Sequence, residues 1–353
     1  MSNTLLRSLY ECRDTPLIER VIQWESWSEL MLSLPNLIVN VYFIFRFNRI
    51  AVFHPNLKVL MLSTNFGAIC ISSLHPIFLL IPTQWYSIER GSYVTAFFVY
   101  SMVYANSVAV LFVSFKFFVF GLERKWAMNK RHSYEIYDGS LAKQLVLRTV
   151  LLLCMVVVVK IVVLFYRSTA SSVDQRLTES FLFECHPLVA FPLTAIAGIS
   201  LVFGVYEFYR VQHFVKQNRH DARSLTESFL FRETQSVLEV MNPLVFAYFL
   251  LASTSALVTG FAISLLHYGD CNVHSSTYRI FINASYLAVS VYGLFASLFM
   301  IFKFAAVRRL FYHDFYKLTG RRLLSNRTSV VPYNMDAIQV QSHYFADLNR
   351  AWN

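Results

Sequence analysis

The chain has 353 residues, of which 56% are hydrophobic and only 15% are charged, and its formal net charge is +10. An average soluble domain carries roughly 25% charged residues, so this composition excludes an ordinary soluble protein. The basic residues stand in short clusters between apolar stretches rather than along one domain, which argues against a nucleic-acid partner.

The first 27 residues are polar and carry charges of both signs. They contain Arg7, Glu11, Arg13, Asp14, Glu19, Arg20 and Glu25, and they lack the apolar core of a secretory signal peptide. We expect residues 1–27 to form an extracellular segment. The first spanning helix would then act as its own insertion signal.

Seven apolar stretches follow, each long enough to cross a ~30 Å hydrocarbon layer at about 1.5 Å per helical residue. They cover roughly residues 28–47, 57–81, 93–120, 147–166, 188–210, 243–266 and 280–302. The sequence predicts an all-α polytopic membrane protein with a seven-helix bundle over residues 28–302. Pro35, Pro76 and Pro192 fall inside these stretches and are kink candidates, whereas Pro243 falls at a predicted span end.

The distribution of Lys and Arg predicts the orientation. Most of the 31 basic residues lie in the first, third and fifth loops and in the tail, and the third-loop cluster begins at Lys116. Lys160 is the one basic residue that we place within a span. Because loops rich in Lys and Arg stay in the cytoplasm, the N-terminus is predicted outside and the C-terminus inside a cell membrane.

Residues 303–318 differ from the spans because their apolar positions follow one helical face. Phe304, Val307, Phe311, Phe315 and Leu318 share that face, and Arg308, Arg309 and Lys317 are available to lipid headgroups. We expect an amphipathic helix on the inner membrane surface, in contact with membrane lipids. Residues 319–353 are polar and are expected to form a disordered cytoplasmic tail.

The chain offers no obvious catalytic chemistry. It has no G-x-S-x-G or P-loop signature and no closely spaced pair of His ligands in a span, so we expect no enzyme, no catalytic residue and no cofactor. His267, Cys271 and His274 lie close together in the last outer loop, but such a mixture in a short loop is more often incidental than a metal site. No metal site is predicted.

An acid–arginine pair, Glu123-Arg124, ends the third span. Two interpretations are open. In a switching receptor, Glu123 holds Arg124 by charge-assisted hydrogen bonds in the resting state, and outward movement of the sixth helix frees the guanidinium for a partner. In the simpler interpretation, the pair is a solvated helix end that carries the charge expected on the inner side.

Several motifs resemble those of the nematode serpentine chemoreceptors. They are Phe53-His54-x-Asn56-Leu57 and Glu123-Arg124-x-x-Ala127 followed by Tyr134-Glu135. The chain is most similar to the epsilon class, and the segment from Ser224-Leu225 through Glu233 adds to this similarity. The alpha and beta classes share the pattern. It departs from the expected Arg-x-Gln and Glu-Asn pairs at Ser228-Phe229 and Glu233-Thr234.

The resemblance implies a G-protein-coupled receptor bundle in a sensory neuron, with the cilium of that neuron as the expected location. Such a receptor would detect a small environmental molecule and signal through a heterotrimeric G protein. A membrane transporter or ligand-gated channel is the alternative function. The paired repeats with matching broken helices that many transporters show are not evident in the sequence.

Three cysteines are predicted on the oxidising outer side, namely Cys12, Cys185 and Cys271, whereas Cys70 and Cys154 lie inside spans. Three outer cysteines permit one bridge, either Cys185–Cys271 or Cys12–Cys271. The top of the third span has no cysteine, so the bridge that rhodopsin-type receptors use between that point and the second outer loop cannot form.

Candidate ligand contacts lie in the outer half of the predicted bundle. Lys160 could contact an acidic ligand, or it could extend toward the outer headgroups without any functional role. His75, Tyr100, Tyr104 and Tyr286 could line the same cavity, or they could simply pack against neighbouring helices.

Overall fold

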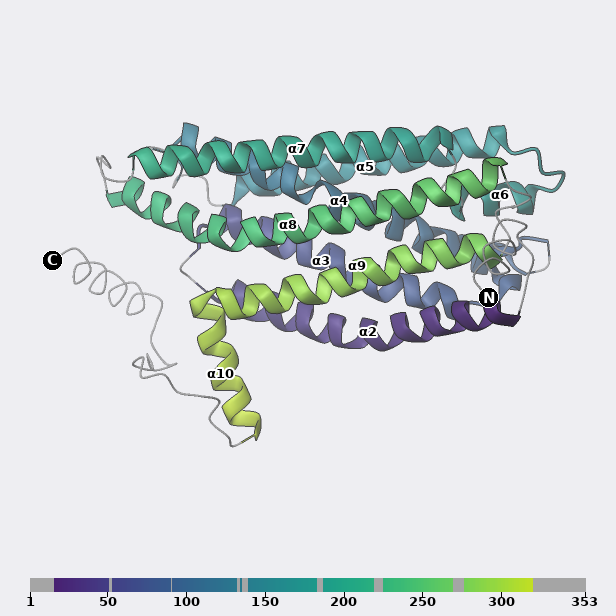
Figure 1. Cartoon of the computed structure of the whole chain (residues 1–353), viewed down its shortest axis with the longest axis horizontal. Helices are drawn as coiled ribbons and strands as arrows, with labels where there is room; N and C mark the ends of the chain where they lie inside the picture. Colours follow the sequence, from purple (N-terminus) through teal and green to yellow (C-terminus); the bar gives the residue numbers. More distant parts are fainter. Residues whose placement is uncertain are drawn as a thin grey trace.

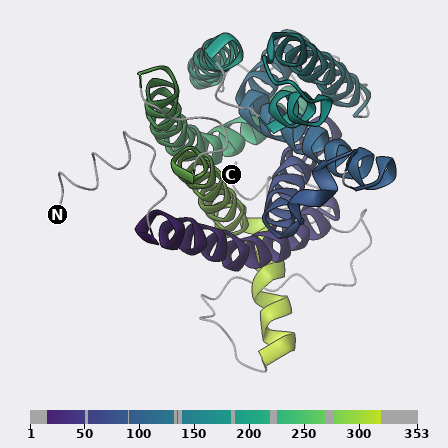
Figure 2. The ribbon, with the colours of Figure 1, turned by 90° about the vertical axis from the view of Figure 1, so that its right-hand side faces the viewer.

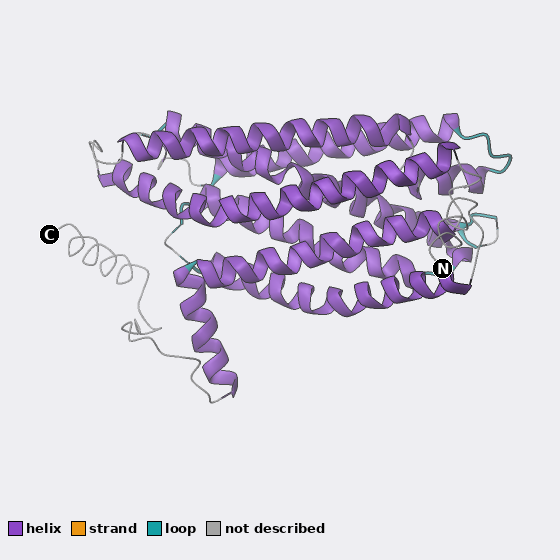
Figure 3. Cartoon of the chain, in the orientation of Figure 1, coloured by secondary structure: helices purple, strands orange, loops and turns teal. Residues whose placement is uncertain are grey.

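The computed structural model describes residues 16–50, 53–89, 91–131, 134, 139–182, 187–218, 225–268 and 276–319. All regular structure in these residues is helical (Figure 3). Within these described ranges, seven helices are long and apolar enough to cross a membrane. They are α2 (Pro16–Asn48), α3 (Pro55–Leu80), α4 (Tyr93–Asn129), α5 (Ser140–Arg167), α7 (Pro187–Asn218), α8 (Leu225–Tyr268) and α9 (Ser276–Lys303).

The seven long helices form a closed bundle whose axes run roughly along one direction (Figure 1). Seen from one end, they surround a common centre, and α2 packs against α9 to close the ring (Figure 2). Helix α4 contacts the three spanning helices α3, α5 and α7. The start of α2 and the helix α10 (Ala305–Thr319) lie at opposite ends of the bundle, as an odd number of spans requires.

Several helices extend well beyond the apolar stretches that predict them. Helix α2 begins at Pro16 rather than near residue 28, and α8 begins at Leu225 rather than at 243. Consequently Pro243 lies inside α8 and not at its end. Hydropathy misses the first part of α8 because it contains polar and acidic residues. Partners elsewhere in the chain accommodate these residues; Glu227, for example, lies 2.5 Å from Arg131 Nε. Pro35, Pro76 and Pro192 lie inside helices, as expected.

Two glycines allow α4 and α7 to approach closely. A Cβ atom added at Gly204 would lie 2.6 Å from the backbone oxygen of Phe117, and one added at Gly121 would lie 3.2 Å from Gly204 Cα. Small residues at such a crossing let helix backbones meet without a side chain between them, which strengthens packing where lipid offers no hydrophobic driving force. The crossing positions the inner end of α4, where Glu123 and Arg124 lie.

Helix α10 confirms the predicted helix after the last span. Asp314 attaches it to α2, since its carboxylate lies 2.6 Å from Arg46 Nη2 and accepts a 2.8 Å hydrogen bond from the Tyr42 hydroxyl. Val307 is buried against the bundle, while Leu318 at the far end of the predicted apolar face is exposed. Its contact with the membrane surface stays a prediction, and the tail from residue 320 lies outside the described residues.

The outer end carries two short helices that the sequence analysis does not predict, η1 (Thr83–Tyr86) and α6 (Val173–Leu182). Asp174 of α6 accepts hydrogen bonds from the Ser87 hydroxyl at 2.5 Å and from the backbone N–H groups of Ile88 and Glu89 at 2.9 and 3.1 Å. A single carboxylate therefore ties the second outer loop to the first. It does so near the top of α4, which has no cysteine to form a bridge.

Candidate functional site

The Glu123-Arg124 pair is fully enclosed at the inner end of α4. Both side chains are 0% exposed, and the guanidinium donates two hydrogen bonds to the carboxylate, from Nε at 2.6 Å and from Nη2 at 2.8 Å. A two-point Arg–carboxylate contact is among the stronger polar interactions in proteins. The interpretation of a solvated helix end is therefore wrong, because neither charge reaches water.

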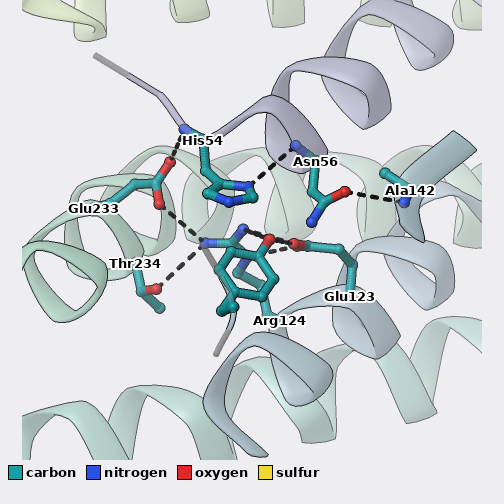
Figure 4. Close-up of polar contacts among 8 residues, drawn as sticks. His54, Asn56, Glu123, Arg124, Ala142, Glu233 and Thr234 are labelled. Carbon is teal, nitrogen blue, oxygen red and sulfur yellow. Dashed lines mark hydrogen bonds and ion pairs between the residues drawn. The ribbon is translucent and has the colours of Figure 1, made fainter. Parts of the chain in front are cut away.

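The remaining face of the guanidinium turns toward α8 (Figure 4). Arg124 Nη1 donates to the Thr234 hydroxyl at 3.3 Å and lies 3.9 Å from a carboxylate oxygen of Glu233. Glu233-Thr234 is one of the two places at which the sequence departs from the pattern of the receptors that it resembles. Sequence reasoning missed them because the contact crosses from the third span to the sixth, and no local spacing signals it.

The start of α3 closes the site from another side. The backbone N–H of His54 donates to Glu233 at 2.6 Å, and the His54 ring accepts from the Asn56 N–H at 3.2 Å. Asn56 in turn accepts from the Ala142 N–H at 3.1 Å (Figure 4). Gly139 precedes α5 and has a φ of 73°, a conformation that favours glycine. Because glycine has no side chain to cap α5, the side chain of Asn56 from α3 caps it instead.

Tyr134 joins the network from the segment between α4 and α5. Its hydroxyl donates to the Glu123 carboxylate and accepts from Arg124 Nη2 at 3.3 Å. Its ring packs against the His54 ring with 4.2 Å between centroids. Burial and the neighbouring Glu123 carboxylate raise the pKa of the Tyr134 hydroxyl, so it remains a hydrogen-bond donor at physiological pH.

The sequence motifs before α3, at the end of α4 and at Tyr134 thus form one polar network that the structure brings together with α8. Its charged members are Arg124 and two carboxylates, all buried in the inner end of the bundle. A buried ion pair is costly to leave half-made, because the partner that remains is an uncompensated charge. The network therefore holds α4 and α8 together, and the inner ends of these helices can separate only if Arg124 changes partners.

At the outer end, the structure brings together two of the five candidate ligand residues. The His75 and Tyr286 rings stack with 3.5 Å between centroids and 9° between planes. His75 Nδ1 lies 2.6 Å from the Glu29 carboxylate, and the Tyr286 hydroxyl accepts from the Asn106 amide at 3.0 Å. Glu29 and Asn106 are buried polar residues of spans that sequence reasoning missed, and each has one oxygen without a hydrogen-bond partner.

The other three candidates lie apart from that stack. Tyr100 donates to the Tyr86 backbone oxygen at 2.8 Å and contacts Thr178 of α6, so it supports the outer loops. Tyr104 donates to the Cys154 backbone oxygen of α5 at 3.0 Å. Lys160 is 8% exposed, so its side chain lies within the bundle and does not extend along the lipid-facing surface.

A cavity with about 50 Å³ of space for water lies further inward, between α2, α3, α4, α8 and α9. None of the five candidate ligand residues lines it. Lys116 does, and its side chain is 94% buried, since only 6% of it is exposed. The placement of Lys116 among the third-loop residues was therefore wrong, because α4 continues past it to Asn129.

Two groups of candidate residues cannot be placed. Cys12, Cys185 and Cys271 lie outside the described residues, so the choice of bridge stays open, and Cys70 and Cys154 are free thiols in spans. Cys271 and His274 of the rejected metal cluster also lie outside. Among the residues that the structure describes, no group of three His, Cys, Asp or Glu side chains could hold a metal ion.

Comparisons with known proteins show the fold and no closer relationship. No family model matches the sequence, and no curated protein matches it. The crystal structure of squid rhodopsin is similar, with a TM-score of 0.55 and 9% sequence identity over 92% of this chain and 94% of that chain. At this identity the similarity extends to the fold alone. The chain is therefore an all-α multi-pass membrane protein with a rhodopsin-like seven-helix bundle.

Proposed function

We propose that this protein is a G-protein-coupled chemosensory receptor of the nematode serpentine type, closest to the epsilon class. It detects a small environmental molecule at its outer side and signals through a heterotrimeric G protein at the plasma membrane of a sensory neuron. The observation that carries the proposal is the buried network in which Arg124 of α4 contacts Thr234 and Glu233 of α8.

A signalling receptor needs an element with two arrangements, one of which a ligand favours. The Arg124 network supplies such an element. In the resting arrangement the guanidinium donates hydrogen bonds to Glu123, Tyr134 and Thr234. When the inner end of α8 moves away, Arg124 loses its Thr234 contact and gains access to a protein partner, so breaking the network is coupled to opening a docking surface.

The outer polar group around His75 is the proposed ligand contact. Glu29, His75, Asn106 and Tyr286 join α2, α3, α4 and α9, so a ligand that binds them changes how these helices pack. Lys160, Tyr100 and Tyr104 remain weaker candidates. The observed contacts of Tyr100 and Tyr104 connect helices and outer loops, which is a supporting role.

The test expresses the full chain in cells with a panel of Gα subtypes and exposes it to a library of small odorants and solutes. We expect ligand-evoked dissociation of a G protein. Arg124→Ala should abolish this response, whereas Glu123→Gln should raise the ligand-independent signal, since it releases the guanidinium but preserves side-chain shape. Ionic current or solute uptake without any G protein would instead support a channel or transporter.

The two variants need a check on folding, because both residues are completely buried. Surface labelling of an N-terminal tag measures how much of each variant reaches the cell surface, and signals are compared per surface receptor. If both variants change the G-protein signal per surface receptor in the same direction, the network is only structural. A normal signal from Arg124→Ala would show the same.

A further inference from the structure

Lys116 is a buried basic side chain whose contacts among the described residues are all with neutral groups. Its Nζ donates to the Tyr292 hydroxyl at 2.9 Å. It also lies 4.1 Å from the Tyr292 ring centroid, 4.5 Å from that of Tyr248 and 5.0 Å from that of Phe117. Each ring face attracts a cation, but none carries a negative charge.

No acidic residue is among the described residues that line the cavity beside Lys116. The other polar residues that line the adjacent cavity are all neutral: Asn36, Thr64, Asn65, Ser72, Tyr292 and Ser297. Arg124 on the same helix has two carboxylates beside it, but Lys116 lies eight residues further out, which is about 12 Å along the helix. A buried charge in a protein is normally paired, because desolvation without a partner is costly.

The cavity beside Lys116 is large enough for an ion. Its roughly 50 Å³ exceeds the 10–15 Å³ or so that one water needs, and a chloride ion is only slightly larger than water. Tyr292 takes one of the three ammonium protons, which leaves donors for another acceptor. Asn65 uses one of its two amide protons on the Met61 backbone oxygen, so it can offer a second donor.

The sign and size of the site select the ligand. A metal cation would meet an ammonium group and no carboxylate, so it is disfavoured. The small, mostly apolar cavity is unsuited to a large or strongly hydrated polyatomic anion. We propose that this cavity binds a chloride ion, which compensates the buried Lys116 ammonium at the centre of the bundle. This site is independent of the proposed receptor function.

Bound chloride would stabilise the packing of three helices. Lys116 belongs to α4 and Tyr292 to α9, and the Tyr292 hydroxyl also donates to the Leu244 backbone oxygen of α8 at 3.3 Å. An ion that keeps the lysine charged therefore strengthens this connection. Thermal stability should rise with chloride concentration and saturate as the site fills.

The experiment measures thermal unfolding of the purified full chain in lipid nanodiscs, in sodium chloride and in sodium gluconate at equal ionic strength. For the wild type we expect chloride to raise the Tm by roughly 2 °C at ten times its dissociation constant. Bromide should act similarly. Lys116→Met should remove this difference, whereas Lys143→Met should retain it, because Lys143 is exposed at the start of α5.

Equal stability of the wild type in chloride and gluconate would overturn the proposal, as would a chloride effect that persists in Lys116→Met. If Lys116→Met does not fold, crystals of the wild type grown in bromide decide the question. An anomalous bromide peak within contact distance of Lys116 Nζ supports the site, and a cavity without such a peak refutes it.

Discussion

Replacing Thr234 by Val should raise ligand-independent signalling by weakening the contact between α4 and α8. Thr234 is buried, and its hydroxyl accepts a hydrogen bond from Arg124 Nη1 at 3.3 Å. Valine has nearly the same shape but cannot accept that bond. The Glu123–Arg124 pair lies entirely within α4 and is left in place, so the substitution acts on the interhelical contact alone.

The size of the effect follows from the geometry. A hydrogen bond to a charged group contributes about 1.5–3 kcal/mol net. The 3.3 Å separation exceeds the usual ~2.9–3.0 Å for N–H···O, so we take a value at or just below the lower limit of that range, about 1–1.5 kcal/mol. If the bond exists only in the resting arrangement, its loss raises the ratio of open to resting receptor by roughly 5- to 12-fold.

The assay is ligand-independent G-protein dissociation in cells, normalised to receptors at the surface. Thr254→Val is the matched control, since Thr254 lies on the same helix, is exposed, and bonds only to the backbone oxygens of Leu250 and Leu251. Spin labels on the inner ends of α4 and α8 provide a measurement that requires no G protein. Their distance distribution should gain a longer component in Thr234→Val.

The reasoning is refuted if Thr234→Val and Thr254→Val have the same basal signal and the same distance distribution at equal surface expression. That result would mean that Thr234 contributes equally to both arrangements, and Arg124 would then not distinguish a resting state from an open one.

Three further outcomes are expected. Gly204→Ala should lower the free energy of unfolding, measured by chemical denaturation, by about 1–3 kcal/mol, because the added Cβ would contact the Phe117 backbone. Gly198→Ala on the same helix is the control; an added Cβ there meets open space, so this change should be neutral or stabilising. Asp174→Ala should speed amide exchange of Ile88 and Glu89 by roughly tenfold or more, since each loses a bond to a carboxylate, and Gln175→Ala should not. Tags after Met1 and Asn353 should be accessible outside and inside an intact cell respectively; detection of both on one side would refute the topology.

The number and rough position of the spans could be predicted from the sequence, because crossing a bilayer requires long apolar stretches that are visible residue by residue. The prediction was weakest at helix ends. Helix α8 includes polar and acidic residues before Pro243 that a hydropathy criterion assigns to a loop. Their helical state depends on partners such as Arg124 of α4 and Arg131 in the turn after α4.

The candidate site shows the same division. Glu123 and Arg124 could be singled out as neighbours in sequence, and the motif around His54 and Asn56 could be recognised, but their common location could not. Contacts such as Arg124 with Thr234 join residues more than a hundred positions apart. Of the predicted ligand contacts, His75 and Tyr286 lie together, whereas Tyr100 and Tyr104 form hydrogen bonds with other partners.

The sequence by itself determined that this chain crosses a membrane as helices. Its long apolar segments are more stable in the hydrocarbon layer than in water, and in that layer a helix satisfies the hydrogen bonds of the backbone N–H and C=O groups. Only the tertiary structure decided which buried polar groups are paired. Arg124 is surrounded by carboxylates and Lys116 by aromatic rings beside a cavity, although both are basic residues of the same helix. That difference arises because the side chains of neighbouring helices supply the partners, and helix packing alone sets which ones come within reach.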